Sequence, residues 1–134
     1  MINNQVPSSH LDLLEDETRA FAYLATVMKD NSPQVTPVWF DTDGEYILIN
    51  SAQGRLKDKN MRSRPNVALA IQDPGNPYRY LQIRGRVISF TPEGGRDHIN
   101  KLSLKYTGNP RYAGPEDEIR VTYRILPAKV HPHR

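Results

Sequence analysis

A short basic segment holds the residues with the clearest potential for chemistry. It runs from Gly54 to Arg64, follows an expected strand and a glycine-containing turn, and begins an expected helix. A helix start presents N–H groups without intrahelical acceptors and a partial positive charge, so the segment predicts a phosphate site. A solvated basic helix face explains the same spacing equally well. The segment holds five cations, Arg55, Lys57, Lys59, Arg62 and Arg64, against one acid, Asp58.

Two of these cations stand where an anion would be bound. Arg55 offers a two-pronged donor and Lys57 a compact positive charge, both at the start of the expected helix. Ser51 and Gln53, in the loop that leads to the helix, could donate further hydrogen bonds.

Pro37 lies inside a segment that otherwise has the composition of a strand. A proline cannot donate to a strand ladder, so it marks an edge, a bulge or a place open to a ligand. Its neighbours Thr36, Val38 and Trp39 could line a flat ring with backbone N–H and C=O groups. The alternative is a structural bulge with Trp39 as a core aromatic residue.

Tyr78, Arg79 and Tyr80 follow a loop rich in proline and glycine. Tyrosines that flank an arginine can stack on a ring, and the arginine can bind a carboxylate. Ordinary aromatic residues at the edge of a strand are the alternative.

Several kinds of site are excluded by residue type. The chain has no cysteine, which removes disulfides, thiolate metal sites and cysteine nucleophiles. The histidines predict no metal site, because His10 and His98 fall in separate helices and His131 and His133 in a tail expected to be frayed. No glycine-rich phosphate loop, nucleophile elbow or pair of carboxylates is present. If the protein is an enzyme, a cofactor must carry the chemistry.

Length and charge narrow the class of protein. At 134 residues the chain has room for one domain, residues 1–134, and leaves enough exposed surface for an oligomer. A net charge of +3 and a pI near 9.3 indicate an anionic partner. The N-terminus is unlike a signal peptide, and no apolar run approaches the roughly 20 residues that span a bilayer. We therefore expect a soluble cytoplasmic protein with no membrane partner.

Hydrophobic periodicity and turn residues predict the elements that must position these side chains. Helices are expected at about 10–17, capped by Ser8 or Ser9, and at 55–63 and 96–106. Strands are expected at 20–29, 35–40, 45–50, 67–71, 80–90 and 119–125, with a loop at 73–77. The first three strands predict an antiparallel meander. Six strands with few short helices predict a mainly β fold, a closed or partly closed antiparallel barrel.

Two stretches of the sequence resemble a known family. One is Asn-Ser-Pro-Gln-Val-Thr-Pro-Val-Trp-Phe at 31–40, followed by an Asp-Gly turn. The other is Gly-Arg-Leu-Lys-Asp-Lys-Asn-Met-Arg-Ser-Arg-Pro-Asn-Val-Ala-Leu at 54–69. Together they resemble the pyridoxamine-phosphate-oxidase-like split β-barrels, and within them the branch that uses the deazaflavin coenzyme F420. The likeness covers about 11–130, and its most specific part is Arg-x-Lys-x-x-Asn before Arg-Pro.

The resemblance implies a six-stranded split barrel that forms a homodimer, with two equivalent sites at the subunit interface. It implies a phosphate grip by Arg55 and Lys57, to which Leu56, Ser51 and Asn60 are added as neighbours. The cofactor ring would lie against the backbone of Thr36, Pro37, Val38 and Trp39. The partner subunit would contribute the stretch that matches Pro77, Tyr78, Arg79 and Tyr80.

The same resemblance implies an oxidoreductase that transfers a hydride between F420 and a small conjugated or quinone-like substrate, with no obligatory protein acid or base. A phosphate grip of this type also serves FMN, so an FMN-dependent oxidase or reductase is the alternative. The positive charge favours F420, whose phosphate and oligoglutamate tail carry several negative charges.

Two further expectations concern the end of the chain and nucleic acids. After Pro127-Ala128-Lys129-Val130, where family members often carry an aromatic residue, the chain has His131-Pro132-His133, so the substrate-side wall is expected to differ. A barrel that binds nucleic acid is a third hypothesis, but the basic stretch contains no aromatic residue for base stacking. We therefore expect a small-molecule substrate and no nucleic-acid partner.

Overall fold

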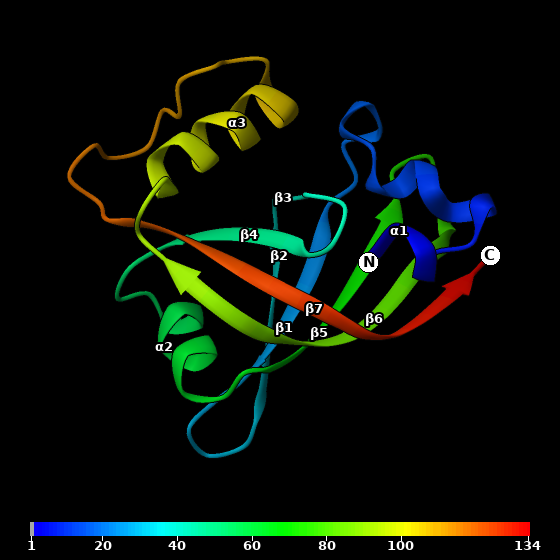
Figure 1. Cartoon of the computed structure of the whole chain (residues 1–134), viewed down its shortest axis with the longest axis horizontal. Coiled ribbons are helices and arrows are strands. Elements are labelled where there is room, and N and C mark those ends of the chain that lie inside the picture. The colour runs from blue at the N-terminus through cyan, green and yellow to red at the C-terminus, as the bar shows by residue number, and fades with distance from the viewer. Residues whose placement is uncertain (1) are drawn as a thin grey trace.

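The protein is built on one antiparallel sheet of seven strands (Figure 1). The computed structural model describes residues 2–134. Neighbours in the sheet follow the order β2-β1-β5-β6-β7-β4-β3, and the pairs are antiparallel. The strands are β1 (Ala22–Val27), β2 (Pro33–Val38), β3 (Phe40–Thr42), β4 (Ile47–Ala52), β5 (Asn66–Asp73), β6 (Asn76–Thr91) and β7 (Arg120–His133).

The sheet curls around its apolar face into an open half-barrel, which confirms the predicted mainly β barrel class (Figure 1). Alternate residues of each strand point into the core, because successive side chains of a strand face opposite ways. The largest of these fully buried strand residues are Leu24, Phe40, Ile47, Ile49, Leu69, Ile71, Leu81, Ile83 and Tyr123.

Short helices lie at both ends of the sheet (Figure 1). α2 (Leu56–Ser63) packs on β1 and β4, and α3 (Gly95–Thr107) packs on β4 and β7. Both helices are confirmed to within one residue of the predicted bounds. At the other end lie α1 (Ile2–Gln5) and two 3₁₀ turns, η1 (Ser8–Leu14) and η2 (Asp16–Thr18).

The predicted first helix at 10–17 is therefore wrong in type. The local hydrogen bonds span three residues, as from the Glu15 N–H to the Asp12 carbonyl at 3.1 Å. The segment starts after Pro7, and no serine side chain caps it. Ser9 instead contacts the His10 ring, with 2.8 Å between Oγ and Nδ1. The segment is held by burial of Leu13 and Leu14 rather than by α-helical hydrogen bonds.

The predicted count of six strands and the meander are also wrong. The expected strand at 35–40 divides at Trp39 into β2, which pairs with β1, and β3, which pairs with β4. β2 and β4 are not neighbours, so the first strands do not form a three-stranded meander. Tyr106 of α3 stabilises the break between β2 and β3. Its hydroxyl donates to the Ala20 carbonyl at 2.6 Å and accepts from the Phe40 N–H at 3.3 Å.

Two segments expected to be irregular are part of the sheet. The predicted loop at 73–77 is a tight hairpin in which Asp73 pairs with Asn76. The tail continues β7 to His133, which pairs with Tyr80 of β6 and stacks on its ring at 4.8 Å. His10 also contacts the His133 carbonyl at 2.9 Å through Nε2. These partners are distant in sequence, which is why local composition predicted a frayed end.

Candidate functional site

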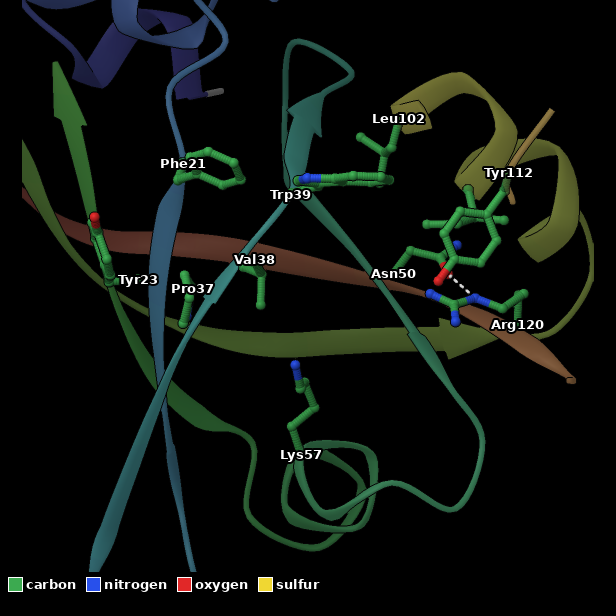
Figure 2. Close-up of a pocket in the computed structure, with 11 residues that line it drawn as sticks. Phe21, Tyr23, Pro37, Val38, Trp39, Asn50, Lys57, Leu102, Tyr112 and Arg120 are labelled. Carbon is green, nitrogen blue, oxygen red and sulfur yellow. Dashed lines mark hydrogen bonds between the residues drawn. The ribbon is translucent and has the colours of Figure 1, made fainter. Parts of the chain in front are cut away.

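A cavity of about 410 Å³ opens between α2, α3 and the end of the sheet where β2 gives way to β3 (Figure 2). It brings together four of the residues predicted to bind a cofactor: Pro37, Val38, Trp39 and Lys57. Seven other residues, which sequence reasoning missed, complete its lining: Phe21, Tyr23, Asn50, Ile99, Leu102, Tyr112 and Arg120.

The basic wall of the cavity starts at a tight turn. Gly54 has a φ of +94°, a conformation that favours glycine, and Arg55 is the N-cap of α2. The Asp58 carboxylate reaches back to the Gly54 N–H at 2.9 Å. The first-turn N–H groups of α2 have no intrahelical acceptor, so they add to the positive potential of this wall.

Helical geometry divides the five cations of the basic segment. Arg62 pairs with Asp58 at 2.8 Å and lies over the Phe90 ring, with its guanidinium carbon 4.5 Å from the ring centroid. Arg64 donates to the Val27 carbonyl at 2.7 Å. Arg62 and Arg64 therefore bind other groups of the protein itself, and Lys59 is exposed. Only Arg55 and Lys57 remain at the start of α2, where the phosphate interpretation needs them.

Lys57 extends from α2 toward the cavity (Figure 2). Burial lowers the pKa of its ammonium, and the nearby charges of Arg55 and Arg120 lower it further. Within residues 2–134 no carboxylate lies within ion-pair distance of Lys57. A bound anion would supply the charge that this ammonium lacks.

Arg55 does not line the cavity, but its positive charge acts on Lys57. Its guanidinium pairs with Glu118 at 3.1 Å, and Glu118 also pairs with Arg120 at 3.1 Å. Burial raises the pKa of the Glu118 carboxyl, but hydrogen bonds and charge from the two arginines outweigh it and hold that pKa below its ordinary value. One carboxylate is thus shared by two guanidinium groups, and Lys57 is left without a partner among the described residues.

Arg120 and Asn50 form the polar back of the cavity (Figure 2). Asn50 faces Thr122 across the β4–β7 pair, and Arg120 is two residues from Thr122, so the three side chains share one face of the sheet. Arg120 Nε donates to Asn50 Oδ1 at 2.9 Å. Its guanidinium carbon also lies 5.1 Å from the centroid of the Tyr112 ring.

An aromatic wall faces these polar residues. Trp39 stacks on Tyr106 with 5.3 Å between ring centroids, and Tyr106 stacks in turn on Phe21 at 5.2 Å. Tyr112 meets Trp39 edge-on at 6.1 Å. Burial raises the pKa of the Tyr106 hydroxyl, so it stays protonated and holds its carbonyl partner. The cavity therefore combines flat apolar surfaces with a cationic end.

Four predicted site residues lie beside the cavity but do not line it. Thr36 pairs with core Leu24, and Ser51 pairs with core Val121, so both face the interior of the barrel. The Ser51 hydroxyl is buried and has no hydrogen-bond partner among the described residues. Leu56 is about half exposed at the start of α2.

Asn60, the fourth of these residues, is buried against β1 and not in the cavity. Its amide donates to Thr26 Oγ1 at 3.0 Å and accepts from Arg64 at 3.1 Å. It ties α2 to the sheet, so its contact with the cavity is indirect.

The predicted stretch Pro77, Tyr78, Arg79 and Tyr80 lies at the start of β6, at the opposite end of the sheet from α2 and α3 (Figure 1). Arg79 pairs there with Asp12 and, at 2.9 Å, with Asp73. None of the four residues lines the cavity of its own chain. They can join such a site only from a second subunit.

Some of the missed residues left a signal in the sequence. Asn50 is a polar residue at the end of the apolar run Ile47-Leu48-Ile49, and Arg120 falls out of phase with the apolar alternation of Val121, Tyr123 and Ile125. A polar residue in each of two strands is a signal of a shared polar face. Tyr112 and Phe21 left none, because the loop after α3 and the residue before β1 meet at the cavity only in the folded chain.

Two further properties of the described residues concern metal ions and membranes. Among residues 2–134, no group of three or more histidine or acidic side chains is arranged to hold a metal ion. No described helix is both long enough and apolar enough to cross a membrane.

Comparison with known proteins gives a family match over most of the chain. A family model described as pyridoxamine 5'-phosphate oxidase matches residues 10–134. No curated protein matches the sequence.

Solved structures include similar chains. One named F420 reductase is 35% identical, with a TM-score of 0.83, and the match covers 94% of this chain and 98% of that one. A candidate pyridoxamine 5'-phosphate oxidase from Listeria innocua is 22% identical, with a TM-score of 0.69, and the match covers 92% and 94%. A conserved hypothetical protein from Mycobacterium tuberculosis is 21% identical, with a TM-score of 0.73, and the match covers 96% and 84%. The last two show the fold alone.

Proposed function

The chain belongs to the pyridoxamine 5'-phosphate oxidase family, and we propose that within it the protein is an oxidoreductase that uses coenzyme F420. Its role would be hydride transfer between the deazaflavin and a small conjugated or quinone-like substrate. The resemblance in the basic segment and the 35% identity to a protein named F420 reductase support this choice of cofactor.

One observation carries the proposal. Lys57 reaches into the cavity without an ion-pair partner among the described residues, and its pKa is lowered by burial and by two neighbouring arginines. Two guanidinium groups gathered around one ammonium form an unfavourable arrangement that a phosphate would relieve. The residues present therefore fit a phosphate-bearing cofactor.

The rest of the cavity suits the ring of such a cofactor. Pro37 lacks an N–H and Val38 and Trp39 line the cavity, so the edge of β2 offers an apolar backbone surface. Phe21 and Tyr112 add aromatic faces on which a flat substrate can stack. When bound, F420 would supply the hydride chemistry, while Lys57 and Arg55 hold its phosphate and this wall orients its ring.

The active form is proposed to be a homodimer, with the full chain as one binding domain. The stretch 77–80 lies away from its own cavity, and Tyr78 is 75% exposed there. A second copy that presents this stretch would close the open side of the cavity. The site would then lie at the subunit interface.

FMN is the alternative cofactor, because the same cationic turn would hold its phosphate. The net charge of +3 favours F420, whose oligoglutamate tail adds carboxylates. Nucleic acid is disfavoured as a partner, because Arg62 and Arg64 are used within the protein and do not form an open basic strip.

Fluorescence titration of purified protein with F420 and with FMN tests the proposal. We expect F420 to bind at micromolar concentration or tighter, and FMN to bind more weakly. Tight FMN binding without F420 binding would replace the proposal by its alternative. Binding of neither cofactor would reject both.

A further inference from the structure

A buried chain of polar side chains runs from Arg120 in the cavity to a carboxylate beneath α3. Arg120 contacts Asn50, Asn50 contacts His98, and His98 contacts Asp41 of β3. The three steps are 2.9 Å from Nε to Oδ1, 3.1 Å from Nδ2 to Nδ1, and 2.8 Å from Nε2 to Oδ1. The side chains of His98, Asp41 and Arg120 are each at least nine-tenths buried.

The direction of each hydrogen bond follows from the first. A guanidinium can only donate, so Asn50 must turn Oδ1 toward Arg120 and its amide NH₂ toward His98. One amide hydrogen is used by the Gly95 carbonyl at 2.9 Å, and the other points at His98 Nδ1. His98 Nδ1 must then carry a lone pair, and Nε2 must carry the proton that is donated to Asp41.

Charged groups surround this chain on every packed element. Asp41 on β3 is the acid that faces His98, and its Oδ2 lies 3.6 Å from Lys101 Nζ of α3. Lys105 of α3 also interacts electrostatically with this carboxylate. Arg120 of β7, with Glu118 beside it, stands beyond Asn50. The Thr122 hydroxyl also reaches His98 Nδ1, at 3.3 Å.

We propose that His98 is a positioning residue: in its neutral form, with the proton on Nε2, it fixes the Asn50 amide, and Asn50 holds Arg120 in the cavity. Loss of the Nδ1 acceptor would leave one hydrogen of the Asn50 amide without its partner, and the hold on Arg120 would loosen. The cavity therefore has a buried polar support that does not touch the ligand, and its effect on cofactor affinity rests on the function proposed above.

The ligand-free protein tests the positioning itself. Long-range ¹H–¹⁵N spectra at about pH 8 should show His98 with Nε2 protonated and Nδ1 bare, and the Arg120 Nε–H should be protected from exchange. His98→Asn and Arg120→Lys assign the two signals.

Two variants separate positioning from packing. His98→Asn keeps an oxygen acceptor at the place of Nδ1, so the Arg120 Nε–H should remain protected. His98→Ala removes the acceptor, and protection should be lost. His131→Asn, at an exposed position of β7, is the matched control and should behave as the unmodified chain.

The same variants test whether this chain of polar side chains affects cofactor binding. F420 should bind His98→Ala about tenfold more weakly than the unmodified chain at pH 8, and His98→Asn within about twofold of it. A proton on Nδ1 at pH 8, or Arg120 protection that does not depend on His98, overturns the proposal. If the spectra hold but neither F420 nor FMN binds, only the proposed function fails.

Discussion

The Asp58 carboxylate accepts a hydrogen bond from the Gly54 N–H, with 2.9 Å between Oδ2 and N. The acid in the middle of the basic segment thus shapes the turn that presents the cations. Its other oxygen receives the Tyr123 hydroxyl and the Arg62 guanidinium. Because Tyr123 is fully buried, these bonds tie the turn to the barrel core.

We expect Asp58→Asn to destabilise the protein by about 2–4 kcal/mol, since it removes a buried charged acceptor from three donors. Burial raises the pKa of this carboxyl, but the bonds from Gly54, Tyr123 and Arg62 outweigh burial and hold it below its ordinary 3.8. A lowered acid pKa adds stability above that ordinary value, and the stability is lost as pH falls through the folded value. The free energy of unfolding, measured with urea at neutral and acid pH, should fall less steeply with decreasing pH in the variant than in the unmodified chain. An equal slope in the two proteins would show that other acids dominate the pH dependence.

Alanine at Lys57 or Arg55 is expected to weaken cofactor binding by roughly 1.5–3 kcal/mol each, the value of a hydrogen bond to a charged group. The fold should survive, because neither side chain belongs to the core. Trp39 is the only tryptophan and lines the cavity, so quenching of its emission can report binding. Lys59→Ala, on the same helix but exposed, is the matched control. Equal affinities for all three variants would contradict the phosphate assignment.

Cofactor affinity should decrease at alkaline pH because of Lys57. Burial and the charges of Arg55 and Arg120 hold its pKa below the ordinary 10.5, so it loses its proton earlier than an exposed lysine does. Affinity is therefore expected to be full below the lowered pKa and to fall as pH rises through it. Titrations across the alkaline range, with Lys57→Arg as the reference, check this. The arginine variant keeps its charge and should remain flat.

Subunit mixing should detect a site shared between two chains. Lys57→Ala and Tyr78→Ala homodimers are each expected to bind the cofactor weakly. Their heterodimers should contain one native site, because the intact Lys57 of one chain meets the intact Tyr78 of the other. Co-expression with two tags, followed by titration of the doubly purified heterodimer, measures the recovered stoichiometry. No recovery would place Tyr78 outside the site.

The sequence by itself determined the features that depend on neighbouring residues. α2 and α3 follow from their turn residues and periodicity, and the proline in β2 marked the strand edge that lines the cavity. The glycine turn before Arg55 and Lys57 was also local, because a positive φ favours glycine and a helix start leaves N–H groups free. These features needed no knowledge of the rest of the chain.

Only the tertiary structure decided which of the local features work together. The five cations looked alike in sequence, but helical geometry turned Arg62 and Arg64 onto Asp58 and Val27 and left Lys57 toward the cavity. Asn50, His98 and Arg120 meet although 48 and 70 residues separate the first from the other two. The division of β2 from β3 and the pairing of the C-terminal strand are equally non-local. Contacts between residues so far apart leave no periodic pattern in the sequence, because the pairing of each strand depends on the whole sheet and not on its neighbouring residues.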